Sequence, residues 1–260
     1  MYYNLQVHSS YDLLNSTIKY ESLFSKLIKD NQKSVVIVDP NMYGAIKAHK
    51  EAKKSGVNLR YGIGLLKLNI LCKSEKMFYK LLEISTKFMN EEEWTVENFA
   101  NEMIDYKDDF ILIVVDELRD SMEFSYLNNL LNKYNFYFGF NESFQVSTYS
   151  FYENIVYTKP SYYLNKEHYQ QVIVSRAIRD NKKLNIQELT TISGEEFVRE
   201  QKDFEEILAF GDEGLHSIFE KAFENQKEII GSCQYDLNFS GYHLPKYIYG
   251  EKEEIFSKLS

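Results

Sequence analysis

Short, wholly apolar segments that alternate with helical segments constrain the fold of this chain more than any other feature. Residues 35–38 (Val-Val-Ile-Val) and residues 110–115 (Phe-Ile-Leu-Ile-Val-Val) contain no polar side chain. Runs of this kind are typical of strands that are buried on both faces of a parallel sheet. Residues 42–54 have a helical pattern, and Gly56 is the expected C-cap of that helix. The alternation therefore predicts a parallel α/β architecture.

The same alternation continues along most of the chain. Further strands are predicted at residues 3–8, from 57, and at 68–72, 136–140 and 155–158, and further helices at about 77–85, 96–104, 124–131 and 166–179. In the first of these strands, the alternation places Gln6 and His8 side by side on one face. About seven strand–helix repeats favour a barrel over an open sheet. From about residue 186 the pattern is helical, and the last segment, 235–260, is irregular.

The acidic composition argues against nucleic-acid binding by this chain alone. The formal net charge is -9, with 30 Lys and Arg against 39 Asp and Glu. A domain that grips nucleic acid is expected to be basic, because its cations must neutralise phosphates. The apolar runs are too short to cross a bilayer, and the first residues lack the pattern of a signal peptide. A cytoplasmic protein without a membrane segment is therefore expected.

Two motifs near the N-terminus are distinctive. Residues 6–14 read Gln-Val-His-Ser-Ser-Tyr-Asp-Leu-Leu, and residues 38–45 read Val-Asp-Pro-Asn-Met-Tyr-Gly-Ala. They resemble the motifs of polymerase-and-histidinol-phosphatase (PHP) domains, which usually read His-x-His-Ser-x-Tyr-Ser-Leu-Leu and Thr-Asp-His-Gly-Asn-Met-Phe-Gly-Ala. The resemblance implies a distorted parallel (β/α)7-type barrel with a short helical and irregular C-terminal extension.

A third motif, near the C-terminus, narrows the resemblance. Residues 242–247 read Tyr-His-Leu-Pro-Lys-Tyr. They are similar to the Tyr-His-Leu-Pro-Lys-Phe segment that leads from the PHP domain toward the palm in bacterial DNA polymerase III alpha subunits. By this resemblance, residues 1–232 form a PHP domain and residues 233–260 form a linker toward a polymerase palm that is absent from the sequence.

The resemblance also points to a metal site that has lost most of its ligands. An intact PHP site uses His and carboxylate side chains at the C-terminal ends of the barrel strands to hold zinc or manganese ions. Residues 159–164 read Lys-Pro-Ser-Tyr-Tyr-Leu, where the family typically has Asn-Asp-x-His-Tyr-Leu. The corresponding ligand positions in this chain are Gln6, His8, Asp39, Pro40, Gly64, Pro160 and Tyr162.

Among these positions, His8 and Asp39 are the two that keep a ligand-type side chain. A catalytic zinc normally takes three protein ligands. We therefore expect this chain to have no metal ion, no cofactor and no catalytic residue. His8 and Asp39 are expected instead to form a hydrogen-bonded pair or to be polar plugs at the barrel mouth.

The function implied by the resemblance is structural. The domain would support the rest of the polymerase alpha chain, would offer a docking surface to a proofreading exonuclease or another replisome protein, and would meet DNA only through the full polymerase. One alternative is an active PHP phosphoesterase or 3′–5′ exonuclease in which Gln6, His8, Asp39 and Asp116 share the metal ions. A second alternative is an unrelated α/β-barrel enzyme.

Overall fold

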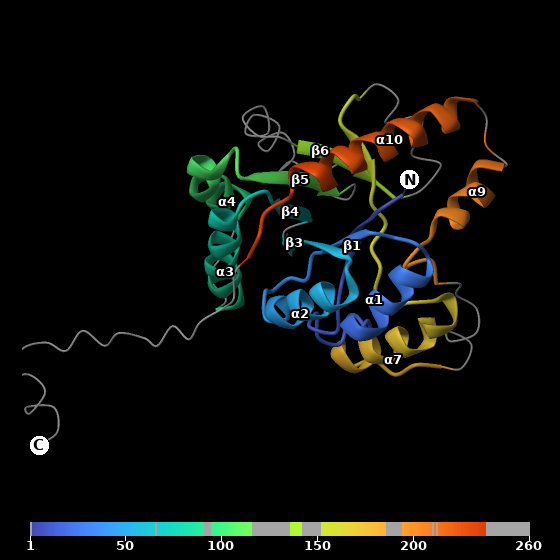
Figure 1. Cartoon of the computed structure of the whole chain (residues 1–260). Coiled ribbons are helices and arrows are strands. Elements are labelled where there is room, and N and C mark those ends of the chain that lie inside the picture. The colour runs from blue at the N-terminus through green and yellow to red at the C-terminus, as the bar shows by residue number, and fades with distance from the viewer. Residues whose placement is uncertain are drawn as a thin grey trace, which may run out of the picture.

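The computed structural model describes residues 2–65, 67–90, 95–115, 136–141, 152–185, 194–209, 211 and 213–237. Within these residues, seven strands form one curled sheet in the order β1-β2-β3-β4-β5-β6-β7, with helices packed around it (Figure 1). The α/β barrel-like fold is therefore confirmed. The strands are β1 (Asn4–Val7), β2 (Ser34–Ile37), β3 (Asn58–Leu65), β4 (Leu68–Cys72), β5 (Phe110–Val115), β6 (Phe136–Phe140) and β7 (Ile155–Tyr157).

The helices occupy most of the segments between the strands and after the last one. They are α1 (Tyr20–Lys29), α2 (Ala45–Ser55), α3 (Glu75–Met89), α4 (Val96–Met103), α7 (Tyr169–Arg179), α9 (Gln201–Ala209) and α10 (Glu213–Ser232), with short 3-10 helices η1 (Ile104–Tyr106) and η4 (Lys166–His168). Gly56 ends α2 with a left-handed φ of 73°, as the sequence predicts. No helix of the described part of the chain is long and apolar enough to cross a membrane.

The sheet is parallel except around β4. Strands β1, β2 and β3 pair in parallel, and so do β5, β6 and β7. Strand β4 runs antiparallel to both of its neighbours. Two residues separate Leu65 from Leu68, and one of them, Lys67, has a left-handed φ of 61°. A connection of this length cannot cross over the sheet, so β3 and β4 form a hairpin that interrupts the parallel order.

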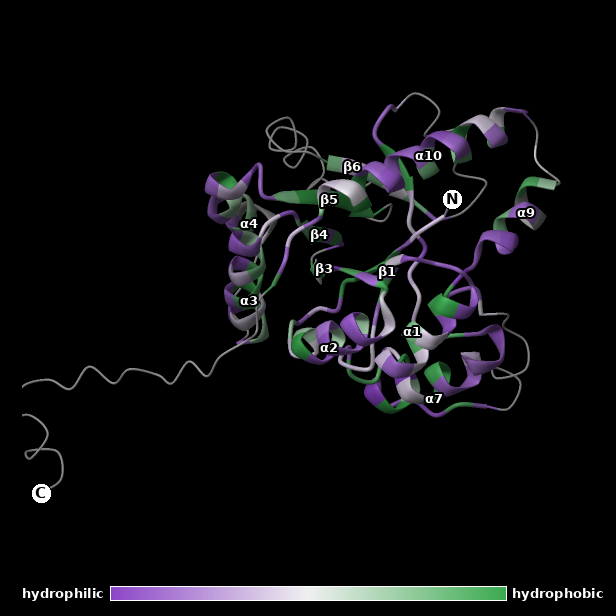
Figure 2. Cartoon of the chain, in the orientation of Figure 1, coloured by the Kyte–Doolittle hydropathy of each residue, from purple (hydrophilic) through white to green (hydrophobic). Residues whose placement is uncertain are grey.

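In β2, and in β4 to β7, alternate residues contribute to two different cores. Val35 of β2 packs under α1 and α2, whereas its neighbour Val36 lies on the concave side with Ile111 of β5 and Val156 of β7. This is the period of two that strand geometry imposes. In Figure 2, the helices α1, α2 and α7 each carry hydrophobic and hydrophilic residues, as expected of helices with one face on the sheet. The concave side is therefore an apolar barrel interior.

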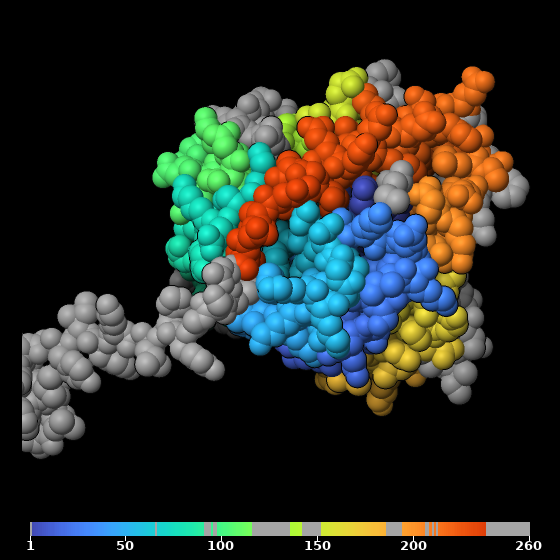
Figure 3. All heavy atoms as spheres, viewed as in Figure 1, coloured from blue at the N-terminus to red at the C-terminus, as the bar shows by residue number. Residues whose placement is uncertain are grey.

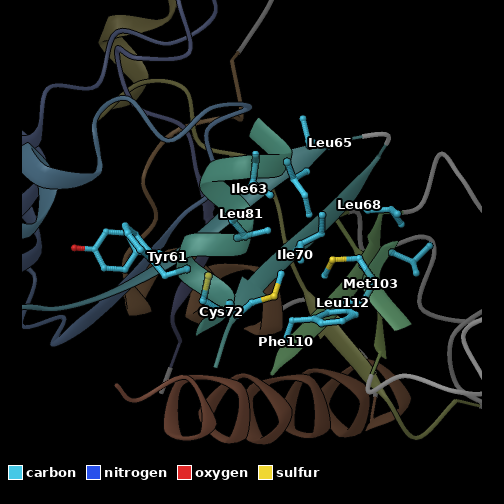
Figure 4. Close-up of a cluster of buried hydrophobic side chains, with 14 of the residues drawn as sticks. Tyr61, Ile63, Leu65, Leu68, Ile70, Cys72, Leu81, Met103, Phe110 and Leu112 are labelled. Atoms are coloured by element: carbon cyan, nitrogen blue, oxygen red, sulfur yellow. The ribbon is translucent and has the colours of Figure 1, made fainter. Parts of the chain in front are cut away.

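A second outer core fills the space between the β3–β4 hairpin and the helices α3 and α4. Figure 4 shows Ile63 of β3 and Ile70 of β4 beside Leu81 of α3, with Met103 of α4 and Phe110 of β5 in the same cluster. All five side chains are fully buried. This packing fixes the hairpin, and with it the position of the β3 residues that reach the barrel mouth.

Two sets of contacts join the edge strands β1 and β7 and close the curled sheet. Beyond β7, the backbone N–H of His8 donates to the carbonyl of Ser161, and the N–H of Ser161 donates to the carbonyl of Gln6, both at 2.9 Å. Nearer the start of β1, the side-chain amide of Gln226 on α10 accepts from the Tyr3 N–H at 3.0 Å and donates to the Tyr157 carbonyl at 2.6 Å. Figure 3 shows α10 (red) crossing one face of the molecule. A buried side chain thus joins the edges where they do not pair directly.

Candidate functional site at the mouth of the barrel

A bulge in β1 determines which side chains reach the barrel mouth. The pairing register between β1 and β2 shifts between Asn4 and Val7. As a result, Leu5 packs in the concave core and Val7 in the outer core, which a regular alternation would not allow. Gln6 accepts a hydrogen bond from the Thr158 hydroxyl at 3.1 Å. The sequence predicts a simple alternation over residues 3–8 that places Gln6 and His8 on one face, and this alternation is wrong at Leu5 and Val7.

His8 directly follows β1 and is 6% exposed. Its ring stacks on that of Tyr162, with the ring centroids 4.5 Å apart. Its Nδ1 lies 3.1 Å from Oδ2 of Asp12, although the alignment of the two groups falls short of a hydrogen bond. Among the described residues, neither ring nitrogen of His8 has a hydrogen-bond partner.

Asp39 lies two residues beyond β2 and is 3% exposed. Its carboxylate accepts hydrogen bonds from the backbone N–H of Ser9 at 2.6 Å and from the Ser9 hydroxyl. Burial raises the pKa of the Asp39 carboxyl to about 6, although the Ser9 hydrogen bonds and the nearby His8 ring lower it. Asp39 is thus held by Ser9, whereas His8 faces Asp12. The hydrogen-bonded His8–Asp39 pair considered from the sequence does not form.

Gly64, which the resemblance aligns with a family glutamate, lies beside His8. A Cβ placed on Gly64 would lie 3.7 Å from Cε1 of His8 but 2.8 Å from the backbone carbonyl of Val38. The second distance is closer than real Cβ atoms approach a neighbour. The backbone at Val38, just after β2, therefore takes the room that a longer side chain would need, and this corner of the site cannot regain a carboxylate without a shift of the backbone.

The other family ligand positions also lack a metal-binding side chain. Pro40 and Pro160 are half-buried and have no side-chain donor atom. Tyr162 is half-buried and its ring is stacked on His8. Asn69 of β4 is a neighbour of this site that the sequence analysis missed. It is 2% exposed, and its Nδ2 has no partner among the described residues. It was missed because it interrupts an apolar run and belongs to no motif.

The side chains at the mouth do not fit the metal centre that the fold implies. Among the described residues, no group of three or more His, Cys, Asp or Glu side chains is placed to hold a metal ion. The mouth offers the imidazole of His8, the carboxylate of Asp39 already bonded to Ser9, the carboxylate of Asp12 facing His8, and the amides of Gln6 and Asn69. Amides are poor ligands for zinc compared with His, Cys or carboxylate. Asp116 and the motif at residues 242–247 lie outside the described residues, as does the helix predicted at 124–131.

A family model described as "PHP domain" matches residues 4–180. The chain belongs to the PHP domain family. This confirms the resemblance that the N-terminal motifs indicate. The match covers the segments that contribute Gln6, His8, Asp39 and Tyr162 to the mouth. The site described above therefore lies within the matched part of the chain.

The PHP domain is also similar to curated DNA polymerase III alpha subunits. It is 24% identical to that of Staphylococcus epidermidis over 256 residues, which cover 94% of this chain and 22% of the relative. It is 33% identical to that of Mycoplasma genitalium over 93 residues, which cover 33% of this chain and 11% of the relative. The chain thus spans at most about a fifth of the length of these two relatives.

One solved structure is similar at low identity. It is the crystal structure of a proposed metal-dependent phosphoesterase from Bifidobacterium adolescentis, with a TM-score of 0.36 and 9% identity. The match covers 81% of this chain and 96% of that one.

Proposed function

We propose that this PHP domain is the N-terminal domain of a DNA polymerase III alpha subunit, and that it works as a scaffold in chromosomal replication in the cytoplasm. The similarity over 94% of the chain to the Staphylococcus epidermidis subunit supports the connection to the polymerase. The state of the mouth supports the scaffold role, since both ligand-type side chains are engaged by protein groups. His8 stacks on Tyr162, and Asp39 is bonded to Ser9.

The chemistry of phosphoester hydrolysis explains why the engaged His8 and Asp39 side chains support a scaffold role. Metal ions catalyse hydrolysis by generating a hydroxide at neutral pH and by stabilising charge on the phosphoryl oxygens. Each of these tasks needs a cation fixed by several ligands. At this mouth, with a glycine at position 64, the His8, Asp12 and Asp39 side chains do not form a group placed to hold an ion among the described residues. The proposed domain therefore has no catalytic residue and no resident cofactor.

The proposed partners follow from the acidic net charge of this chain and from the fact that its relatives are much longer chains. A domain with a formal net charge of -9 fits against a basic polymerase module, because complementary surfaces steer and orient association. We propose that it contacts the remainder of a polymerase alpha chain and a proofreading exonuclease or another replisome protein, and that it meets DNA through the polymerase.

Metal content tests the loss of the site directly. After dialysis against zinc and manganese and then against metal-free buffer, the purified chain should retain far less than one ion per molecule by elemental analysis. Single-stranded DNA incubated with the chain and manganese should release no more nucleotide than with the His8→Ala variant. Stoichiometric metal, or nucleotide release that His8→Ala abolishes, would show instead an active PHP phosphoesterase with substituted ligands.

A further inference from the structure

The guanidinium of Arg176 reaches the barrel mouth from α7. Its Nη1 donates to Oε2 of Glu196 at 2.9 Å, and its Nε donates to Oδ1 of Asn15 at 3.1 Å. Its Cζ lies 4.5 Å from the centre of the Tyr162 ring. A planar guanidinium can bond through its edge and lie over an aromatic face simultaneously. One cation thus contacts the loop after β1, the segment after β7 and residues 194–200.

The contacts of Arg176 continue into a closed circuit. Asn15 donates from Nδ2 to Oδ2 of Asp12 at 2.8 Å, and the same Asp12 oxygen lies 3.1 Å from Nδ1 of His8. His8 stacks on Tyr162, which returns the circuit to Arg176. We call the six residues of this network the mouth brace: His8, Asp12, Asn15, Tyr162, Arg176 and Glu196.

The backbone beside the brace shows which segments it joins. The N–H of Thr17 donates to the carbonyl of Tyr162 at 2.9 Å, and the N–H of Tyr162 donates to the carbonyl of Glu196 at 2.8 Å. These bonds connect loops that are more than thirty residues apart along the chain at their nearest, 162 and 196. Holding segments that are so far apart in the sequence in one arrangement costs conformational entropy. Cross-linking contacts between the segments are needed to offset that cost.

We propose that the mouth brace cross-links the barrel mouth in place of metal ions, with the permanent charge of Arg176 as its cation. This inference rests on the proposed loss of the metal site. Asp12 is 8% exposed and Asp39 is 3% exposed, and a nearby positive charge favours the charged form of a buried carboxylate. Two members of the brace, Asp12 and Tyr162, stand where the family motifs quoted above have Ser and His. The departures from the family pattern thus add a carboxylate and a ring that belong to one network.

A plain surface ion pair would contribute little, because solvent screens it. Arg176 and Glu196 are better shielded than that, with side-chain exposures of 23% and 30%. Arg179, one turn further along α7, is the natural comparison. It also donates to Asn15, at 3.1 Å, but its side chain is 43% exposed and pairs with Asp180, the residue next to it. Among the described residues, the cation that lies over the Tyr162 ring is that of Arg176.

Thermal unfolding of the full chain, with and without EDTA, tests the brace. We expect Arg176→Met to lower Tm by about 5 °C, Arg176→Lys to lower it by less, and Arg179→Met to change it by no more than about 1 °C. EDTA should leave every one of these Tm values unchanged. Equal Tm values for Arg176→Met and Arg179→Met would overturn the brace.

Amide exchange and a second variant localise the effect. In Arg176→Met, the amides of Thr17 and Tyr162 should exchange at least about tenfold faster, whereas those of the β3–β4 hairpin should not change. In a Tyr162→Leu background, the Tm loss caused by Arg176→Met should shrink, because both changes remove the same network. Full additivity, or no change in local exchange, would contradict the brace.

Metal content separates this inference from the proposed function. Bound ions, together with a Tm that falls in EDTA, would contradict both. A metal-free chain in which Arg176→Met behaves like wild type would contradict the brace alone and leave the scaffold proposal intact.

Discussion

The Gln226→Leu variant is expected to unfold about 3 kcal/mol more easily than the wild-type chain. Gln226 is 0% exposed, and its amide is bonded to the Tyr3 N–H and to the Tyr157 carbonyl. Leucine has a similar volume but no polar atom, so the buried Tyr157 carbonyl and the part-buried Tyr3 N–H would both lose their partner. Each such group costs about 1–3 kcal/mol. The loss falls on the contact between the edges of the sheet, so the barrel should open there first.

Urea unfolding followed by circular dichroism measures this difference. The matched control is Gln171→Leu, the same chemical change at an exposed position on α7, which is expected to alter the free energy of unfolding by less than about 0.5 kcal/mol. If the two variants unfolded at the same midpoint urea concentration, the idea that Gln226 joins β1 to β7 would be wrong. A fall in m-value in Gln226→Leu would instead indicate that the edges have already separated in the native state.

The strands of the fold are largely predictable from the sequence because their apolar runs are local. The run at residues 110–115 gives β5 with both bounds correct, and 136–140 gives β6. The direction of β4 is not predictable in this way. Its hydrophobic pattern is the same in either direction, and the direction depends on the short link to β3 that contains Lys67. The bulge in β1 cannot be predicted from the sequence either, because it depends on the pairing register with β2.

At the site, the sequence motifs identify the important residues but not the residues that these contact. The motifs bring His8 and Asp39 to attention, and both lie at the mouth. Their actual partners are Asp12, Tyr162 and Ser9, and Arg176 reaches them from a helix far along the chain. Such contacts depend on how the segments pack, so a single sequence carries no signal for them. Asp12 is the exception, since a carboxylate in place of the usual family Ser is visible in the first motif.

The pH dependence of stability should report the buried carboxyl of Asp39. Burial raises its pKa from the ordinary 3.8 to about 6 in the folded chain. The folded state therefore holds this proton more tightly than the unfolded state does. The contribution of Asp39 to stability is fully present below about pH 3.8 and is lost as the pH rises toward 6. A shift of about two units corresponds to a cost of about 3 kcal/mol above pH 6.

Asp39→Asn should therefore stabilise the chain at neutral pH. An asparagine carries no charge, and its oxygen can still accept from the Ser9 N–H that now bonds to Asp39. Urea unfolding should show the variant to be more stable than wild type by up to about 3 kcal/mol at pH 7.5, with most of the gain gone at pH 4.5. Asp180→Asn is the control. The Arg179 hydrogen bond lowers the pKa of that exposed carboxyl, so its removal should bring no gain at either pH.

The sign of this change decides between the two views of the mouth. A carboxylate that ligates a metal ion is stabilised in its charged form by the ion, so its replacement by an amide loses both the ion and the stability that the ion confers. A buried carboxylate beside Ser9 carries the cost of desolvation with no metal ion to offset it. An Asp39→Asn variant that is less stable than wild type at pH 7.5, and equally stable once EDTA is added, would contradict the scaffold proposal. A stabilised variant that does not respond to EDTA is the expected result.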